Sequence, residues 1–250
     1  MITDSFDDKS EPLFSVSSFL GPQAHLCDVC LLTFSDVILY ELRKRFALRE
    51  IENKLKSANG DRPIYLFENG GKTMAVALCG IGATLAGGHV EELHWITGAT
   101  KFVMFGSAGS LNREATDGKY VIPTEAYRDE GMSYHYAPPA DYITIRGADT
   151  VAQIFDELKA PYVKGRVWTT DAFYRETRNQ FLARRSEGCI AVEMELAGVQ
   201  AVCDFYGFAL YDFLETGDVL DAPVYENEKL GSANHDLNKL FLAFEIARRI

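Results

Sequence analysis

Two glutamates separated by a single methionine follow a short apolar run. Glu193, Met194 and Glu195 come directly after residues 189–192, whose composition is typical of a buried strand. Carboxylate oxygens at a strand end accept charge-assisted hydrogen bonds, and a pair of carboxylates suits the vicinal hydroxyls of a sugar. A plainer interpretation is that one glutamate stabilises the N-terminus of the next helix through the helix dipole. The residues alone leave both interpretations open.

A stretch of small residues follows another apolar run. Residues 106–109 read Gly-Ser-Ala-Gly and come after the strand-like residues 101–105. Small side chains let backbone N–H groups lie close to a ligand, and Ser107 adds a hydroxyl. The stretch lacks the lysine and the glycine spacing of the known nucleotide-binding loops, and a tight turn is a common use of such a sequence.

Aromatic and acidic side chains follow two further runs. Phe173 and Tyr174 lie in residues 169–176, where a ring would be placed to stack on a planar base, although such rings are also common in cores. Asp218 follows Gly217, just past the apolar run 208–214. It would face the same crevice or cap a turn.

The order of elements explains why these residues should meet. The patterns predict strands over residues 26–34, 63–67, 73–78, 101–105, 120–122, 162–168, 189–192 and 208–214. They predict helices over residues 83–97, 149–158, 195–205 and 235–249, and one that begins after the N-cap Ser35. A turn over 69–71 joins two of the strands as a hairpin. The expected fold is α/β, a single-domain mixed central sheet covered by helices on both faces. Ligands of such sheets bind beyond the carboxyl ends of the strands.

Composition and charge exclude several classes of partner. The chain has 250 residues, 47% of them hydrophobic and 24% charged, which is ordinary for a globular domain. A formal net charge of −11 disfavours nucleic acid and anionic membranes. The acidic N-terminus has no apolar segment typical of a secretory signal, and no apolar stretch reaches the ~20 residues needed to span a bilayer. We therefore expect a cytoplasmic protein.

The number and spacing of the five cysteines do not indicate a metal centre. They are odd in number and lie mostly in apolar runs, which indicates buried free thiols and a reducing compartment. Cys27 and Cys30 have CxxC spacing, but no second pair stands at zinc-ligand spacing. Neither a metal nor an organic cofactor is expected.

Taken together, these segments resemble the nucleoside phosphorylase family, which includes purine nucleoside phosphorylases and uridine phosphorylases. The resemblance extends from about Leu26 to the C-terminus, which divides the chain into an N-terminal extension (1–25) and a catalytic domain (26–250). It rests on five ordered motifs, of which Glu-Met-Glu is the strongest. The motifs occupy residues 80–82, 105–111, 121–124 with 128–136, 170–174 and 192–198.

The resemblance implies roles for the residues at the sugar. Met194 and Glu195 would hold the ribose, with Glu195 accepting hydrogen bonds from the 2′ and 3′ hydroxyls. Ser107 would face phosphate and sugar. Asp218 matches the acid with which purine-specific members protonate N7 of the leaving base, and burial or a neighbouring carboxylate would have to raise its pKa.

It also implies a pocket for the base. Phe173 would stack on the heterocycle, and four further residues would line the pocket: Val192, Glu193, Ala108 and Gly109. The glutamine and arginine of the uridine-specific pocket do not align with residues 177–179, so a purine is favoured over uridine.

The sequence departs from the family where phosphate should bind. The arginines of phosphorolytic members are absent, and Leu39 and Met104 stand in those regions. Guanidinium groups give phosphate its best bidentate contacts. Other arginines, such as Arg43, Arg62, Arg128 or one from a neighbouring subunit, would have to replace them, or water would be the nucleophile.

From the sequence we expect a pentosyltransferase of nucleotide salvage, a purine nucleoside phosphorylase that uses inorganic phosphate as co-substrate. The alternatives are a nucleoside hydrolase, a uridine phosphorylase and a non-catalytic nucleoside-binding protein. By resemblance, the partners are a nucleoside, phosphate and further copies of the chain in a dimer or hexamer.

Overall fold

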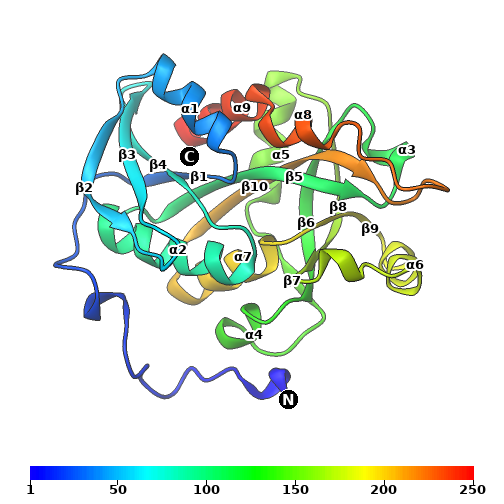
Figure 1. Ribbon diagram of the computed structural model, residues 1–250, viewed down its shortest axis with the longest axis horizontal. Coiled ribbons are helices and arrows are strands. Elements are labelled where there is room, and N and C mark those ends of the chain that lie inside the picture. Colours follow the sequence, from blue (N-terminus) through cyan, green and yellow to red (C-terminus); the bar gives the residue numbers. More distant parts are fainter.

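A ten-stranded mixed sheet forms the centre of the computed structural model, which describes residues 1–250 (Figure 1). The strands are β1 Val29–Thr33, β2 Arg49–Leu55, β3 Arg62–Asn69, β4 Lys72–Leu78, β5 Lys101–Ser110, β6 Tyr120–Asp129, β7 Tyr142–Thr144, β8 Tyr162–Thr170, β9 Cys189–Glu193 and β10 Ala209–Val219. Helices lie on both faces of this sheet. The predicted α/β architecture is confirmed.

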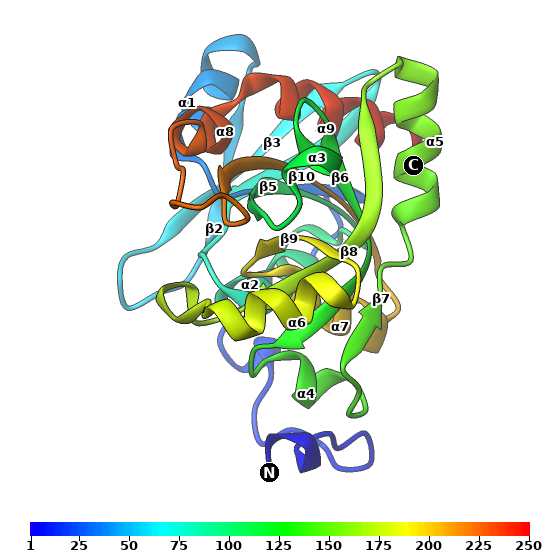
Figure 2. The same cartoon turned by 90° about the vertical axis from the view of Figure 1, so that its right-hand side faces the viewer.

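Half of the sheet closes on itself. The strand order is β10-β6-β8-β9-β5-β1-β4-β3-β2, and β10 also pairs with β5. Since β9 pairs with β5 as well, the strands β5, β10, β6, β8 and β9 form a ring, from which β1, β4, β3 and β2 extend as an open sheet. Figure 2 shows β5, β9 and β10 close together in a view toward this end of the molecule. The sequence predicted the strands but not this closure.

Two helical layers cover the two faces. The helices are α1 Asp36–Arg45, α2 Ala83–Thr97, α3 Arg113–Thr116, α4 Ser133–Tyr136, α5 Ala148–Leu158, α6 Arg178–Ser186, α7 Leu196–Tyr206, α8 Leu230–His235 and α9 Leu237–Arg249, with 3₁₀ turns at Ile2–Asp4, Val16–Ser18 and Phe173–Arg175. Helices α2 and α7 pack on one core, and α1, α5 and α9 pack on the other (Figure 1). Both layers direct helix ends to the carboxyl edge of the sheet.

Several local predictions are confirmed. Ser35 caps α1 by accepting a hydrogen bond of 3.1 Å from the Ile38 N–H. Strands β3 and β4 form the predicted antiparallel hairpin. Its turn places Gly70 and Gly71 at φ of 60° and 79°, a left-handed region that favours glycine. All five cysteines are free and buried.

The carboxyl ends of β5 and β10, two neighbouring strands of the ring, were predicted wrongly. Residues 106–109 are not a turn, because β5 continues through them to Ser110 and pairs with β10 along its whole length. Asp218 therefore lies within β10 and not beyond it. Small side chains let two paired strands curve tightly enough to close the ring. The Gly-Ser-Ala-Gly composition of residues 106–109, which suggested a turn, is thus that of a bent strand.

Other differences concern short elements. The C-terminal helix predicted over 235–249 is α9, which begins two residues later, after the cap Asp236, and the short α8 before it was not predicted. Strands β2 and β7 were not predicted. No helix in the structure is both long and apolar enough to cross a membrane.

Candidate functional site

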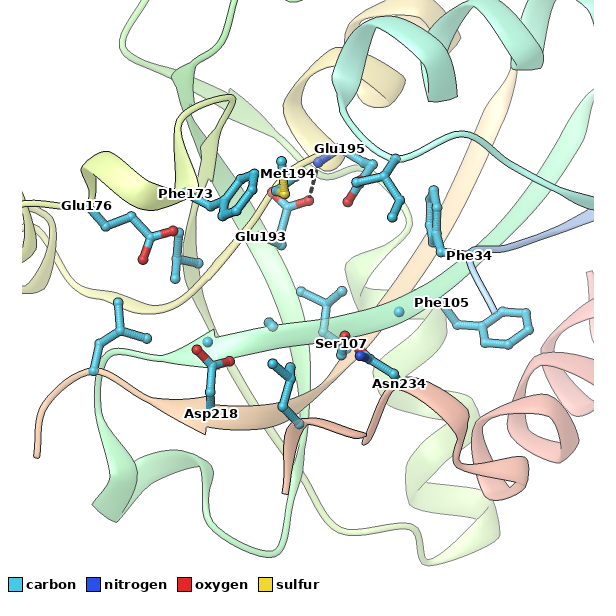
Figure 3. Close-up of a pocket in the computed structure, with 18 of the residues that line it drawn as sticks. Phe34, Phe105, Ser107, Phe173, Glu176, Glu193, Met194, Glu195, Asp218 and Asn234 are labelled. Atoms are coloured by element: carbon cyan, nitrogen blue, oxygen red, sulfur yellow. Dashed lines mark hydrogen bonds between the residues drawn. The ribbon is translucent and has the colours of Figure 1, made fainter. Parts of the chain in front are cut away.

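A cavity of about 850 Å³ opens at the carboxyl ends of β1, β5 and β9 and along β10 (Figure 3). Every residue to which the sequence gave a role lines it, although the residues come from four separate segments. These residues are Ser107, Ala108, Gly109, Phe173, Val192, Glu193, Met194, Glu195 and Asp218. The fold thus brings the predicted set together at one place.

Asp218 owes its position to a break in the β5–β10 pairing. The register between these strands shifts at Thr216 and Asp218, so that Asp218 pairs with Gly109. The Tyr225 hydroxyl donates a hydrogen bond of 3.0 Å to Asp218 Oδ2. Burial raises the pKa of Asp218, which this tyrosine opposes. A raised pKa favours the protonated carboxyl, the form that can donate a proton.

Glu193 is engaged with the protein itself. Its Oε2 accepts hydrogen bonds of 2.7 Å each from the backbone N–H groups of Glu195 and Leu196, and the Thr169 hydroxyl donates to Oε1. Glu193 therefore stabilises the N-terminus of α7, which was the plainer of the two interpretations of this motif. The residue still lines the cavity.

Glu195 belongs to a junction between two helix starts. Its Oε1 accepts a hydrogen bond of 2.6 Å from the backbone N–H of Gly82, the residue before α2. Burial raises the pKa of Glu195, and the Gly82 N–H partly opposes this. A half-buried carboxyl group with acceptor sites to spare suits a pair of sugar hydroxyls.

One end of the cavity is aromatic and acidic. Phe173 is 50% exposed, its ring centroid lies 4.2 Å from that of Tyr174, and its ring faces the cavity from the 3₁₀ turn after β8 (Figure 3). Glu176 lines the same end. Burial and the nearby Asp218 raise the pKa of Glu176 to about 7. The sequence analysis missed Glu176, because no pattern distinguishes it from a surface glutamate of the following helix.

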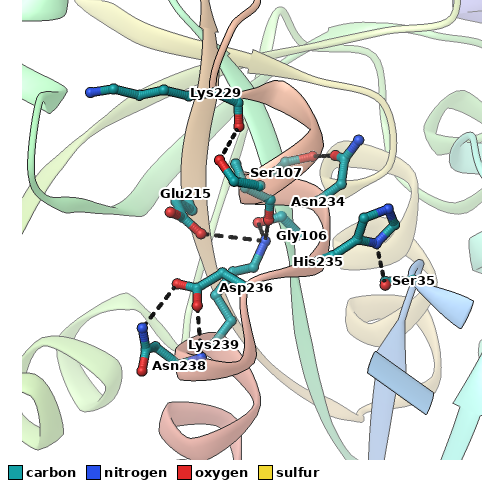
Figure 4. Close-up of polar contacts among 12 residues, drawn as sticks. Ser35, Gly106, Ser107, Glu215, Lys229, Asn234, His235, Asp236, Asn238 and Lys239 are labelled. Atoms are coloured by element: carbon teal, nitrogen blue, oxygen red, sulfur yellow. Dashed lines mark hydrogen bonds and ion pairs between the residues drawn. The ribbon is translucent and has the colours of Figure 1, made fainter. Parts of the chain in front are cut away.

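The opposite end is formed by residues that the sequence did not single out. The side chains of Asn234 and His235 reach it from the end of α8. The Ser107 hydroxyl donates to Asn234 Oδ1, and Ser35 Oγ lies 2.8 Å from His235 Nδ1 (Figure 4). The sequence gave no signal for either, since a polar pair near a C-terminal helix is ordinary.

Comparison with known proteins decides the family. Residues 29–227 match the family model described as the phosphorylase superfamily. The chain belongs to the phosphorylase superfamily.

Curated relatives in the superfamily carry a phosphorylase name. The chain is 27% identical to a purine nucleoside phosphorylase DeoD-type from Caldanaerobacter subterraneus subsp. tengcongensis, over 72% of this chain and 79% of the relative. It is also 27% identical to a protein of the same name from Colwellia psychrerythraea, over 59% and 67% of the two chains.

Solved structures with the same fold carry hydrolase names. A futalosine hydrolase mutant from Helicobacter pylori superposes with a TM-score of 0.69 at 17% identity, covering 88% of this chain and 98% of that one. An AMP nucleosidase from Bacteroides thetaiotaomicron gives 0.67 at 17% identity, covering 88% and 87%. The protein is thus an enzyme of a superfamily that includes nucleoside phosphorylases and nucleosidases.

None of the three arginines that the sequence offered as phosphate ligands, Arg43, Arg62 and Arg128, lines the cavity. Leu39 and Met104 are buried apolar residues. Arg43 lies on the Tyr65 ring, and the buried Arg128 donates to Ser133 and to two backbone carbonyls. Neither these two nor Arg62 lines the cavity, and the one arginine that does is Arg178, from the helix beyond the aromatic end.

A buried carboxyl lies beside Met104. Asp212 pairs with Met104 in the β5–β10 register, is 1% exposed and lines the cavity. Neither of its oxygens has a hydrogen-bond partner in the structure. Burial, with Glu193 and Glu195 nearby, raises the pKa of Asp212 well above its ordinary value. The buried side chain beside Met104 is therefore a carboxyl whose surroundings favour its protonated form.

Proposed function

We propose that this enzyme hydrolyses the N-glycosidic bond of a purine nucleoside, with water as the nucleophile. The products would be the free base and the pentose. The observation that carries the proposal is the absence of any guanidinium at the end of the cavity that faces away from Phe173 and Asp218.

The leaving-group side supports a purine. Phe173 offers a ring on which a flat base can stack, and Asp218 offers a proton to N7. The departing base takes the electron pair of the C1′–N9 bond, and protonation at N7 neutralises the charge that develops there. The raised pKa of Asp218 keeps that proton available closer to neutrality.

The part of the cavity near Glu195 and Met194 supports a pentose as the sugar of the substrate. Glu195 would accept hydrogen bonds from the 2′ and 3′ hydroxyls, with Met194 against the ring. Fixing the sugar while the glycosidic bond stretches favours the oxocarbenium-like transition state over the ground state.

Electrostatics distinguish water from phosphate. Five carboxyl groups line the cavity, from Glu176, Glu193, Glu195, Asp212 and Asp218. The Lys239 ammonium donates to the carbonyls of Gly106 and Ala233 and lies 3.7 Å from Glu215, so its charge is already compensated. The end of the cavity that faces away from Phe173 therefore offers a phosphate dianion no uncompensated guanidinium or ammonium group, whereas an uncharged water molecule needs no counter-charge. The fold itself is compatible with hydrolysis, because a hydrolase and a nucleosidase share it.

A purine nucleoside panel tests the proposal. Inosine, adenosine and their 2′-deoxy forms would be incubated with the protein, with and without inorganic phosphate, in buffer freed of phosphate. We expect release of base and pentose at the same rate in both. Strictly phosphate-dependent release with formation of pentose 1-phosphate would overturn hydrolysis in favour of phosphorolysis. A ligand-induced rise in Tm with no release from any nucleoside would identify a binding protein instead.

A further inference from the structure

The end of α8 is fastened to the strand that carries Ser107. The Lys239 side chain is 1% exposed, and its ammonium donates to the Gly106 carbonyl at 3.1 Å and to the Ala233 carbonyl. These carbonyls immediately precede Ser107 and Asn234. One buried cation therefore holds the chain before each of these two residues, and the Ser107 to Asn234 hydrogen bond joins their side chains (Figure 4).

His235 is anchored through one ring nitrogen only. Its Nδ1 lies 2.8 Å from Ser35 Oγ, which itself accepts the Ile38 N–H as the cap of α1. A serine oxygen has two lone pairs, so it can accept both N–H groups. In that tautomer the proton of the neutral imidazole is on Nδ1 and Nε2 carries a free lone pair. Nε2 has no hydrogen-bond partner in the chain, and the residue lines the cavity.

Asn234 has free donors at the same end. Its Oδ1 accepts the Ser107 hydroxyl, and its amide NH₂ makes no hydrogen bond within the chain. In Figure 3, Ser107 and Asn234 lie on the side of the cavity away from Phe173 and Glu176. A nucleophile must attack C1′ from the side opposite the departing base. With the base against Phe173, this end of the cavity is where the nucleophile has to be held.

We propose that His235 is the general base that activates the attacking water, and that the Asn234 amide holds this water. The assignment rests on the proposed hydrolysis and extends it to the nucleophile. The water oxygen forms a bond to C1′ while the C1′–N9 bond breaks and its electron pair leaves with the base. His235 Nε2 takes one water proton, and the Asp218 carboxyl gives one to N7. Transfer of a proton from His235 to Asp218 through solvent then restores both groups.

The Ser35 contact explains why a histidine on a helix end can serve this role. Removal of a proton from water leaves a cationic imidazolium, whose Nδ1–H remains directed at an oxygen that is itself fixed by α1. The orientation of the ring thus persists through the step. A base oriented by a third group is a common arrangement in catalytic sites.

Two substitutions separate catalysis from structure. His235→Asn keeps an amide near the position of Nδ1 and can retain the hydrogen bond to Ser35, but it lacks a basic nitrogen. His235→Gln places an amide near the position of Nε2, which can contact water but cannot accept its proton at neutral pH. If His235 is the base, both variants lose kcat for phosphate-free inosine hydrolysis by about 10²–10⁴-fold. KM and Tm should stay near the wild-type values, and added imidazole should restore part of kcat to a truncated His235→Ala variant.

His25→Ala is the matched control, because His25 is an exposed histidine outside the cavity, with its Nε2 3.2 Å from Asp28 Oδ1. It should hydrolyse inosine like the wild type. If the wild-type protein hydrolyses inosine and either His235→Asn or His235→Gln keeps kcat within about threefold of it, the assignment of His235 is wrong and the proposed function stands. If the wild type releases no base without phosphate, the proposed hydrolysis fails, and the role of His235 fails with it.

Discussion

Glu195 and Gly82 are joined across the two helices of one face, by the 2.6 Å hydrogen bond from the Gly82 N–H to Glu195 Oε1. Gly82, the residue before α2, has φ of 94°, a conformation that L side chains rarely adopt. The contact fixes the carboxylate before a sugar arrives. Pre-organisation of this kind reduces the entropy lost when a ligand binds.

Glu195→Gln should weaken the hold on the ribose. An amide accepts fewer and weaker hydrogen bonds than a carboxylate, and hydrogen bonds to charged groups contribute about 1.5–3 kcal/mol. We therefore expect kcat/KM for inosine to fall about 10- to 100-fold. The comparison with 2′,3′-dideoxyinosine is decisive, because wild type should strongly prefer inosine and the variant should not. The exposed Glu52→Gln on β2 serves as control, and an unchanged preference in Glu195→Gln would remove Glu195 from the sugar site.

Asp218→Asn should affect only substrates that need a proton on the base. Turnover of inosine should fall by about 10²–10⁴-fold, the usual contribution of a general acid. A 7-methylpurine nucleoside already carries positive charge on its base and should be cleaved by the variant at nearly the wild-type rate. Steady-state kinetics with both substrates provide the measurement. If inosine turnover stays within about threefold of wild type, Asp218 is not the acid.

Glu176 should make stability depend on pH. Its pKa is about 7 in the folded protein against an ordinary 4.5, because of burial and Asp218, so the folded state keeps a proton that the unfolded chain releases. The contribution is fully present below pH 4.5 and is lost as pH rises through 7. Burial shifts Glu193 and Glu195 in the same direction. Thermal unfolding should therefore show Tm falling between pH 5 and 8.

Glu176→Gln isolates the contribution of this one residue. Glutamine resembles the protonated acid, so Tm should match wild type near pH 5 and exceed it at pH 8 by about 2–4 °C, the shift that about 1 kcal/mol gives in a domain of this size. The exposed Glu228→Gln should leave the wild-type profile unchanged. A variant that follows the wild-type pH profile throughout would show that Glu176 does not titrate in this range.

The sequence predicted the core of this site because its motifs lie at or near the carboxyl ends of strands. Phe173 and Glu195 follow β8 and β9, while Ser107 and Asp218 lie within the last residues of β5 and β10, and all four line the same cavity. The α/β class and most elements followed from periodicity, as for α2, whose predicted bounds agree with Ala83–Thr97. Site residues that lie close to a strand or helix with a clear hydrophobic pattern could therefore be predicted from the sequence.

The end of the cavity at Asn234 and His235 could not be predicted from the sequence in the same way. Asn234 and His235 belong to a six-residue helix that returns to the cavity 127 residues after Ser107 and 200 after Ser35. No local pattern records such a long-range contact. Closure of the ring likewise depends on the long-range pairing of β10 with β5. Residues 106–109 suggested a turn because composition alone does not distinguish a bent strand from a turn. Asp212 was missed since it reads as one polar residue within an apolar strand.

Gly109→Ala should distort the cavity where Asp218 is held. A Cβ on Gly109 would lie 2.6 Å from Leu220 Cδ1, 3.0 Å from Val192 Cγ1 and 3.3 Å from Asp218 Oδ1. Overpacking of this kind costs about 1–3 kcal/mol, and relief by movement of Leu220 or Asp218 changes the leaving-group end of the cavity. We expect a lower Tm together with a fall of kcat/KM for inosine of about tenfold or more, since 1.4 kcal/mol is a factor of ten.

Gly88→Ala is the control, because no atom lies within 4 Å of its Cβ position on α2 and alanine favours helix by up to about 1 kcal/mol. It should raise Tm and leave kcat/KM unchanged, whereas wild-type kinetics in Gly109→Ala would mean that the contact between β5 and Asp218 does not shape the site.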